Sequence, residues 1–301
     1  MMFSRAFPPD VIVFDTDALL HARFGGSKRG AQLLALKKYS LPTGTFGRKG
    51  ITPELEKSES LTEVVRRIRS EAGRLDRVSV LLPDSWFRIN ILSLAQLPER
   101  RTEAEEMVRW TLRRSLPVNP EELRLSYEKI SRNGSPPRVL AVAALEKTLR
   151  SIEAAFSAAG ISIVLIEPVG INLWNAISIQ EKPSNHDRLL FYVRRNEFTI
   201  ALFHGDGPVF IRSRSMSGER TLLQEIRLSA SYLKGTVQLD VVDRCYAAGS
   251  ELTQPVIDVI SDEFGTTVET ISLGEFVTCN PALDTARVEA EIAACTGVFI
   301  S

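Results

Sequence analysis

The 301-residue chain contains no long apolar run and few of the residues that build disulfide frameworks or metal sites. The cysteines are Cys245, Cys279 and Cys295, and the histidines are His21, His186 and His204. An odd number of widely spaced cysteines argues against a disulfide framework and favours a reducing, cytoplasmic compartment. Because none of the histidines has a cysteine or a second histidine at ligand spacing, we expect no metal site.

Net charge is also missing, since 37 Lys and Arg residues balance 37 Asp and Glu residues. This balance gives no argument for binding to nucleic acid or to an acidic membrane surface. No apolar run approaches the roughly 18 to 20 residues that a spanning helix needs. Residues 1–10 lack the apolar centre of a signal peptide. The P-loop, nucleophile-elbow and zincin motifs are absent, so the sequence offers no motif for those three chemistries.

The first part of the chain has the pattern of one α/β unit. Residues 11–14 form an apolar run that ends at Asp15-Thr16-Asp17 and predicts a buried strand. The further strands are expected over residues 19–24, 31–39 and 78–82, with a helix over 61–72. Residues 40–59 contain several Gly and Pro residues and are expected to form a loop.

The next part predicts an inserted unit with the order β-α-β-β-α-β. Its strands are expected over residues 87–94, 123–130, 139–144 and 161–166, and its helices over 102–115 and 145–159. A connecting helix is expected over residues 169–179. The polar segment 181–187 (EKPSNHD) marks the boundary between two lobes.

The last part repeats the order of strands, turn, helix and strand, as duplicated lobes do. Strands are expected over residues 189–193, 198–203, 209–213, 237–242 and 268–271, and helices over 222–233, 252–264 and 287–294. Arg212 and Arg214 alternate with less polar residues, which places both on the solvated face of a strand.

Three stretches carry a resemblance to a known family. They are Leu97-Pro98 followed by a helix with Glu106, Arg109 and Trp110, then Leu116-Pro117 and Tyr127; residues 154–168; and residues 205–218 with Gly205-Asp206-Gly207. Together they resemble the PilM family of type IV pilus assembly proteins, which is related to the cell-division protein FtsA and to the secretion protein GspL. The resemblance extends over nearly the whole chain.

The resemblance implies a bilobed, actin-like α/β fold of duplicated, ribonuclease H-like lobes. Residues 1–182 would form the first lobe, with the inserted subdomain at about 87–167, and residues 183–301 a reduced second lobe. It also implies a cytoplasmic scaffold, peripheral to the inner membrane, in a type IV pilus or type II secretion platform. Its partner would be the cytoplasmic tail of a PilN-like membrane protein, which links it indirectly to the assembly motor ATPases. Homo-oligomers are compatible with this interpretation.

The residues that would bind nucleotide depart from the actin-like pattern. That pattern has Asp-x-Gly after the first strand of each lobe, because glycine lets backbone N–H groups approach a phosphate. Here the first motif is Asp15-Thr16-Asp17, and the second falls at Tyr192-Val193-Arg194. Of the family's glycine-rich adenosine loop, Gly249 remains. We therefore expect a pseudo-ATPase in which Asp15, Asp17 and Gly249 are vestiges of a nucleotide cleft, with no cofactor and weak or no binding of ATP and magnesium.

Two other interpretations of these residues stay open. The chain could be an active ATP-binding switch or small-molecule kinase of the same fold, with Asp15 linked to magnesium and Gly249 at the adenosine. Asp15 and Asp17 could share a divalent ion, although a strand-ending turn with solvated acids explains them more simply. A scaffold in an unrelated envelope complex is a third alternative, because fold does not fix function.

The helix after Pro98 supplies the residues expected to bind the partner. They are Arg109, Trp110 and Arg113. Trp110 lies off the main apolar stripe of the helix, so it either packs in the core of the subdomain or lines a groove for a partner peptide.

Overall fold

The computed structural model describes the chain in two compact units. The described residues are 7–15, 17–27, 30–49, 52–113, 119–130, 136–181, 186–195, 197–205, 207–216, 221–239, 241–280, 282–285 and 288–300. The first unit comprises residues 1–86, 148–182 and 271–301, and the second comprises 87–147 and 183–270. The sequence predicted a single boundary between residues 182 and 183, but the chain crosses between the two units at further points.

The first unit is built on a six-stranded sheet with the order β10-β6-β1-β2-β3-β16. The strands are β1 (Asp10–Phe14), β2 (Ala18–Ser27), β3 (Gly30–Ser40), β6 (Arg77–Leu82), β10 (Ser162–Pro168) and β16 (Thr278–Cys279). β1 is antiparallel to β2 and parallel to β6, and every residue of β1 is buried. A central strand covered on both faces needs such a continuous apolar run, which the sequence predicted.

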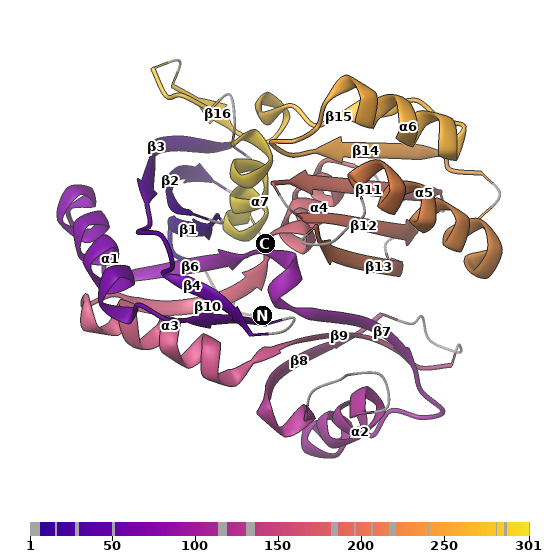
Figure 1. The fold of residues 1–301 in the computed structure, drawn as a ribbon, viewed down its shortest axis with the longest axis horizontal. Helices are drawn as coiled ribbons and strands as arrows, with labels where there is room; N and C mark the ends of the chain where they lie inside the picture. The colour runs from indigo at the N-terminus through magenta and orange to yellow at the C-terminus, as the bar shows by residue number, and fades with distance from the viewer. Residues whose placement is uncertain are drawn as a thin grey trace. The chain divides into compact units, whose positions relative to one another are not determined.

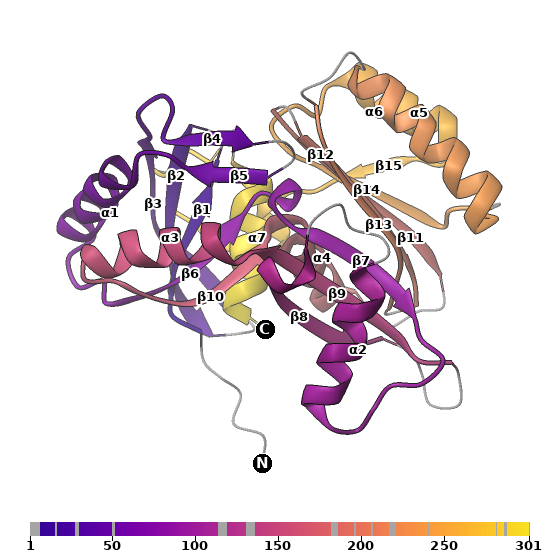
Figure 2. The same ribbon diagram turned by 60° about the horizontal axis from the view of Figure 1, so that its bottom comes forward.

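Helices cover both faces of this sheet (Figure 2). They are α1 (Ser58–Ala72), α3 (Glu146–Ala158), α4 (Val169–Gln180) and α7 (Glu289–Ile300). On one face Phe14 stacks on Phe156 of α3, with ring centroids 6.3 Å apart. On the other face Phe24 stacks on Phe299 of α7 at 5.6 Å.

The segment predicted as a loop over residues 40–59 contains a hairpin instead. Strands β4 (Phe46–Lys49) and β5 (Thr52–Leu55) pair antiparallel. Phe46 packs on Trp86 with ring centroids 4.9 Å apart, and the Thr148 hydroxyl donates to the Pro53 carbonyl at 2.8 Å. The prediction was wrong because these tertiary contacts hold a short segment whose Gly and Pro residues favour a loop.

The second unit contains a five-stranded sheet with the order β13-β12-β11-β14-β15 (Figure 1). The strands are β11 (Asp187–Arg194), β12 (Glu197–His204), β13 (Gly207–Ser215), β14 (Arg244–Ala248) and β15 (Val268–Thr270). Helices α5 (Leu222–Tyr232) and α6 (Gln254–Phe264) lie side by side on one face. Gly265 adopts φ 61° and ends α6, as the sequence predicted.

The described residues of the strand predicted over 237–242, which are 237–239 and 241–242, form no strand. Residues 233–237 continue α5 as a π-helical turn, and Gln238 adopts the left-handed conformation with φ 57°. Leu239 and Val242 are buried under the helices without joining the sheet. A short apolar run packs into a core equally well as a strand or as a loop, so its pattern alone does not decide between them.

A three-stranded sheet with the order β7-β9-β8 completes the second unit. It comprises β7 (Arg88–Ser93), β8 (Leu123–Lys129) and β9 (Arg138–Leu145), and α2 (Arg101–Arg113) covers one face. The inserted β-α-β-β-α-β unit is thus shorter than predicted. Its expected last strand, β10, pairs in parallel with β6 of the six-stranded sheet, so α3 and β10 belong to the first unit.

The C-terminal segment also corrects the predicted second lobe. Residues 271–301 belong to the first unit, where β16 pairs in parallel with β3. Helix α7 packs along α4, and Gly297 permits close contact because a Cβ there would lie 2.1 Å from the Asn172 carbonyl oxygen. In the described part of the chain, no helix is long and apolar enough to cross a membrane.

Candidate functional site

The turn after β1 places Asp15 and Asp17 in the first unit. The Asp15 N–H donates to the Ala18 carbonyl at 2.8 Å, which closes the turn between β1 and β2. Its carboxylate accepts a hydrogen bond from Lys38 Nζ at 3.2 Å. Asp17 is exposed, and Thr16 lies outside the described residues. The turn thus uses the Asp15 N–H internally, and a lysine ammonium stands beside the carboxylate that would face magnesium.

The corresponding strand end in the second unit is Tyr192-Val193-Arg194. All three residues are buried in β11, and the Arg194 guanidinium lies 5.9 Å from the centre of the Tyr192 ring. Glu197 stands opposite Arg194 in the antiparallel pairing of β11 with β12 and is also buried. A buried arginine beside a carboxylate occupies the place where the actin-like pattern has Asp-x-Gly.

Gly249 follows β14 in the second unit and has φ +122°. A Cβ at this position would lie 1.8 Å from the Val193 carbonyl oxygen, because Ala247 and Ala248 bring β14 against β11. The close approach of these two backbones is therefore sufficient reason for glycine here. Asp15 and Asp17 belong to one unit and Gly249 belongs to the other.

Helix α2 gives its three predicted partner-binding residues different surroundings. The Arg109 guanidinium donates to the carbonyls of Pro120 and Leu123, the latter at 2.9 Å, and to the Glu105 carboxylate at 2.9 Å. Arg109 therefore ties α2 to the start of β8. Trp110 is 57% exposed, so the interpretation of it as a core residue was wrong. Arg113 is also exposed, and Leu116-Pro117 lie outside the described residues.

Arg212 was predicted on a solvated face, but the structure shows it half-buried against α5. Its guanidinium donates to the Glu225 carboxylate at 3.0 Å and to the Ser229 hydroxyl at 3.2 Å. Arg214 is exposed as predicted. Within the resembling stretch 205–218, Arg212 thus links β13 to α5, while Asp206 and Gly218 lie outside the described residues.

The surroundings of the histidines and of Cys245 give no sign of catalysis or metal binding. His21 is buried and its Nε2 lies 2.7 Å from the Asp10 carboxylate, while His186 and His204 are exposed. Burial alone would raise the pKa of Asp10, but hydrogen bonds from His21 and Arg23 outweigh it and lower that pKa. Burial raises the pKa of the Cys245 thiol to about 12, which makes it a poor nucleophile. Among the described residues, no cluster of His, Cys, Asp or Glu could hold a metal ion.

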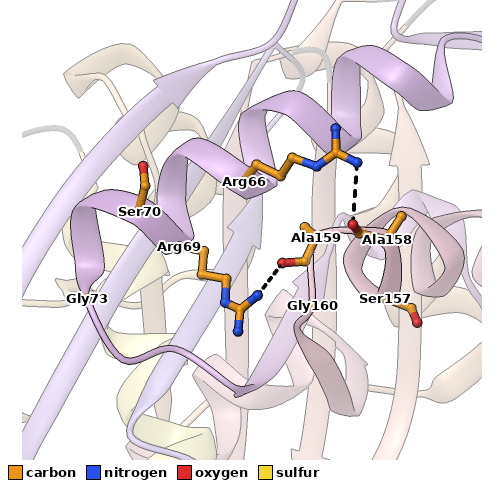
Figure 3. Close-up of a pocket in the computed structure, with 8 residues that line it drawn as sticks. All are labelled: Arg66, Arg69, Ser70, Gly73, Ser157, Ala158, Ala159 and Gly160. Carbon is orange, nitrogen blue, oxygen red and sulfur yellow. Dashed lines mark hydrogen bonds between the residues drawn. The ribbon is translucent and has the colours of Figure 1, made fainter.

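A shallow pocket of about 690 Å³ lies in the first unit where α1 and α3 end (Figure 3). Arg69 donates to the Ala159 carbonyl at 3.0 Å, and Arg66 donates to the Ala158 carbonyl at 3.4 Å. Figure 3 shows both guanidinium groups directed at the C-terminal turn of α3. The arginines thus satisfy carbonyls that the helix leaves unpaired and oppose the negative end of its dipole. The sequence gave no signal for this pocket, because its two sides lie about 90 residues apart in the chain.

A network of polar and charged side chains joins α1 to β3. The Glu71 carboxylate is 2.6 Å from Lys37 Nζ, 2.9 Å from Arg67 Nε and 2.9 Å from the Tyr39 hydroxyl. Hydrogen bonds from Lys37, Arg67 and Tyr39 lower the pKa of Glu71 to about 2. Burial and the hydrogen bond to Glu71 raise the pKa of Tyr39 to about 12.

Comparison with known proteins relates the chain to solved structures of one fold. No family model matches the chain, and no curated protein matches it in sequence. A chain of the PilM-PilN type IV pilus biogenesis complex matches with a TM-score of 0.79 and 18% identity, over 97% of this chain and 99% of that one. An actin-like ATPase-fold protein of unknown function from Bacteroides thetaiotaomicron matches with a TM-score of 0.57 and 14% identity, over 98% of both chains.

A third similar structure is that of a secretion-system protein. The cytoplasmic domain of EpsL, an inner-membrane component of the type II secretion system of Vibrio cholerae, matches with a TM-score of 0.54 and 13% identity. The match covers 96% of this chain and 94% of the EpsL domain. The predicted actin-like fold is therefore confirmed, and the chain is PilM-like in its fold.

Proposed function

We propose that the protein is a non-catalytic, actin-like scaffold in the inner-membrane platform of a type IV pilus or type II secretion machine. The observation that supports this most is the likeness to a chain of the PilM-PilN complex over nearly the whole length of both chains. In this proposal the protein is cytoplasmic, lies at the inner membrane and binds the cytoplasmic tail of a PilN-like membrane protein. Assembly motor ATPases then connect to it through that partner.

The three segments that would bind nucleotide support the absence of catalysis. Lys38 pairs with Asp15, buried Arg194 faces Glu197 across a hairpin, and the space at Gly249 is filled by the Val193 carbonyl. Phosphate binding needs backbone N–H groups that point at the ligand, with glycines that allow close approach. A lysine at Asp15, a buried arginine at the second strand end and a backbone carbonyl at Gly249 leave little of this arrangement.

The exposed face of α2 is the proposed docking surface. Trp110 offers a large aromatic side chain at 57% exposure, and Arg113 stands one turn further along the helix. Exposed Trp and Arg residues are enriched among the side chains that contribute most to protein–protein binding. Arg109 acts in support, because its contacts hold α2 against β8.

Nucleotide titration tests the non-catalytic part of the proposal. We expect the thermal unfolding midpoint of the purified protein to stay unchanged in excess Mg-ATP, because a ligand stabilises only a state that it binds. ADP and the magnesium salt alone serve as matched controls. A rise of several degrees with Mg-ATP, but not with the magnesium salt, would contradict the proposal and favour the active ATP-binding switch or kinase.

Peptide binding tests the scaffold part. The probe is a synthetic peptide with the sequence of the cytoplasmic tail of a PilN-like protein, titrated into the full chain by calorimetry. We expect Trp110→Ala to weaken binding by about tenfold or more, as loss of an interface aromatic commonly does. Tyr232→Ala is the matched control, because Tyr232 is an aromatic residue on α5 with 46% exposure. Absence of binding to the unmodified protein would refute the partner assignment.

A further inference from the structure

A basic surface runs along the C-terminal half of α1 and the connection to β6. We define it as residues 66–77 (RRIRSEAGRLDR) together with Lys37 of β3, which pairs with Glu71 of α1. Its acidic side chains are Glu71 and Asp76. Six basic side chains therefore stand against two acidic ones, in a chain whose total net charge is zero. The equal numbers of acidic and basic residues in the whole chain do not reveal this local excess of positive charge.

Two groups of ion pairs lie within the basic surface. Glu71 bridges Lys37 of β3 and Arg67 of α1. Further along, Asp76 lies 3.3 Å from Arg74 Nε and 3.6 Å from Arg69 Nη2. Because Glu71 and Asp76 are each shared between two cations, pairing leaves an excess of positive charge in both groups.

Helix capping explains some of these arginines and leaves others unexplained. Arg66 and Arg69 donate to the last carbonyls of α3 around the pocket in Figure 3. Arg74 has a side chain 93% exposed to solvent, and Arg67 is 66% exposed. Arg77, at the first position of β6, is exposed as well. Exposed guanidinium groups of this kind contribute little to the stability of a fold.

The apolar side chains of the basic surface point inward. Ile68 and Leu75 are 0% and 1% exposed. The large hydrophobic residues that are exposed in the described chain all lie outside residues 66–77. Protein–protein interfaces have an apolar centre with a polar rim, whereas a layer of anionic headgroups needs only distributed positive charge.

We propose that the basic surface binds the headgroups of anionic phospholipids. This inference goes beyond the proposed function, since it needs no protein partner and gives the protein a direct contact with the membrane. Each arginine or lysine near an anionic lipid surface adds favourable energy that salt screens. Several such residues without an inserted apolar chain give weak, reversible and salt-dependent attachment.

Vesicle sedimentation of the purified full-length protein tests this proposal. We expect the protein to sediment with phosphatidylglycerol vesicles at low salt, to stay in solution with phosphatidylcholine vesicles, and to be released at high salt. The triple variant Arg67→Gln, Arg74→Gln and Arg77→Gln removes three exposed charges and leaves the capping arginines in place. Its binding to phosphatidylglycerol vesicles should fall by about tenfold or more.

The matched control removes the same number of charges from the second unit. It combines Arg100→Gln, Arg101→Gln and Lys129→Gln, all at exposed positions, and should sediment like the unmodified protein. Unchanged thermal unfolding midpoints establish that both variants are folded. Inorganic phosphate in excess should not displace the vesicles beyond its effect on ionic strength; specific displacement would mean a discrete phosphate site and would overturn the proposal.

Two further results would overturn it. One is failure of the unmodified protein to bind phosphatidylglycerol vesicles, and the other is equal loss of binding in the triple variant and the control. Poly-glutamate is the probe for an acidic protein partner. If the surface ignores vesicles but binds poly-glutamate through Arg67, Arg74 and Arg77, its ligand is a protein and the lipid assignment is wrong.

Discussion

Gly249 was predicted as a vestige of a nucleotide loop, and its surroundings give it a role in the fold. Its φ of +122° and the Val193 carbonyl leave no room for a side chain. We expect Gly249→Ala to lower the free energy of unfolding by about 3 kcal/mol or more, from overpacking and backbone strain. Urea denaturation of the purified variant measures this.

Gly235 provides the control for that substitution. Its φ is not positive, and among the described atoms none lies within 4 Å of an added Cβ. Gly235→Ala, inside the helical turn of residues 233–237, should be neutral or stabilise the protein by up to about 1 kcal/mol. Equal effects of the two alanines would contradict the packing role of Gly249.

Adjacent residues on α2 should respond in opposite ways to substitution. Arg109→Gln leaves the carbonyls of Pro120 and Leu123 without their charged donor, so stability should fall by about 1–3 kcal/mol. Trp110→Ala should change it by less than about 0.5 kcal/mol, because the side chain is 57% exposed. Thermal unfolding of the two variants distinguishes them. A large loss in Trp110→Ala would mean that the indole is needed for folding, which would contradict its assignment as a docking residue.

Glu71 makes stability depend on pH in the acidic range. Hydrogen bonds lower its folded pKa to about 2 from an ordinary value of 4.5. A lowered pKa means that the stabilisation is present above the ordinary value and is lost as pH falls from about 4.5 towards 2. Glu71→Gln should therefore flatten this part of the stability profile, measured by urea denaturation across that range. A profile as steep in Glu71→Gln as in the unmodified protein would contradict this role of Glu71.

Among the elements, α4 and α7 show how closely two helices pack in the first unit. Their backbones approach at Gly297, where an added Cβ would lie 2.1 Å from the Asn172 carbonyl oxygen. Gly297→Ala should force the helices apart and lower stability by about 1–3 kcal/mol. Limited proteolysis should then cut α7 faster. Gly274→Ala, whose nearest contact is the Ser272 hydroxyl at 4.0 Å, is the control and should resist cleavage like the unmodified protein.

At the scale of the whole molecule, neither unit is a continuous segment of the chain. Residues 271–301 return to the first unit, where α7 stacks Phe299 on Phe24 and packs against α4. We expect residues 1–182 alone to lack fixed tertiary structure, because one face of their sheet loses its helix. Near-ultraviolet circular dichroism and dye binding measure this. Fusion of residues 271–301 to that fragment through a flexible linker should restore the signal; a folded fragment without them would contradict the division.

Local pattern was enough to predict most elements and an α/β protein. The continuous apolar run at residues 11–14 and the amphipathic stripe of α1 each give one secondary structure because hydrophobic spacing follows backbone geometry. The actin-like fold came from the resemblance of residues 97–127 and two later stretches. The sequence also showed that two segments depart from the nucleotide-binding pattern, Asp15-Thr16-Asp17 and Tyr192-Val193-Arg194. Loss of ATP binding remains a prediction.

Tertiary structure alone decided which segments share a unit and what each polar side chain contacts. Pairing of β10 with β6 and of β16 with β3 depends on partners far away in sequence, which local propensity does not encode. For the same reason, sequence did not show that Arg109 bonds to the Leu123 carbonyl while the neighbouring Trp110 stays exposed. Composition gave a net charge of zero, and folding placed Lys37 beside the arginines of α1 in one basic surface, because it brings β3 alongside that helix.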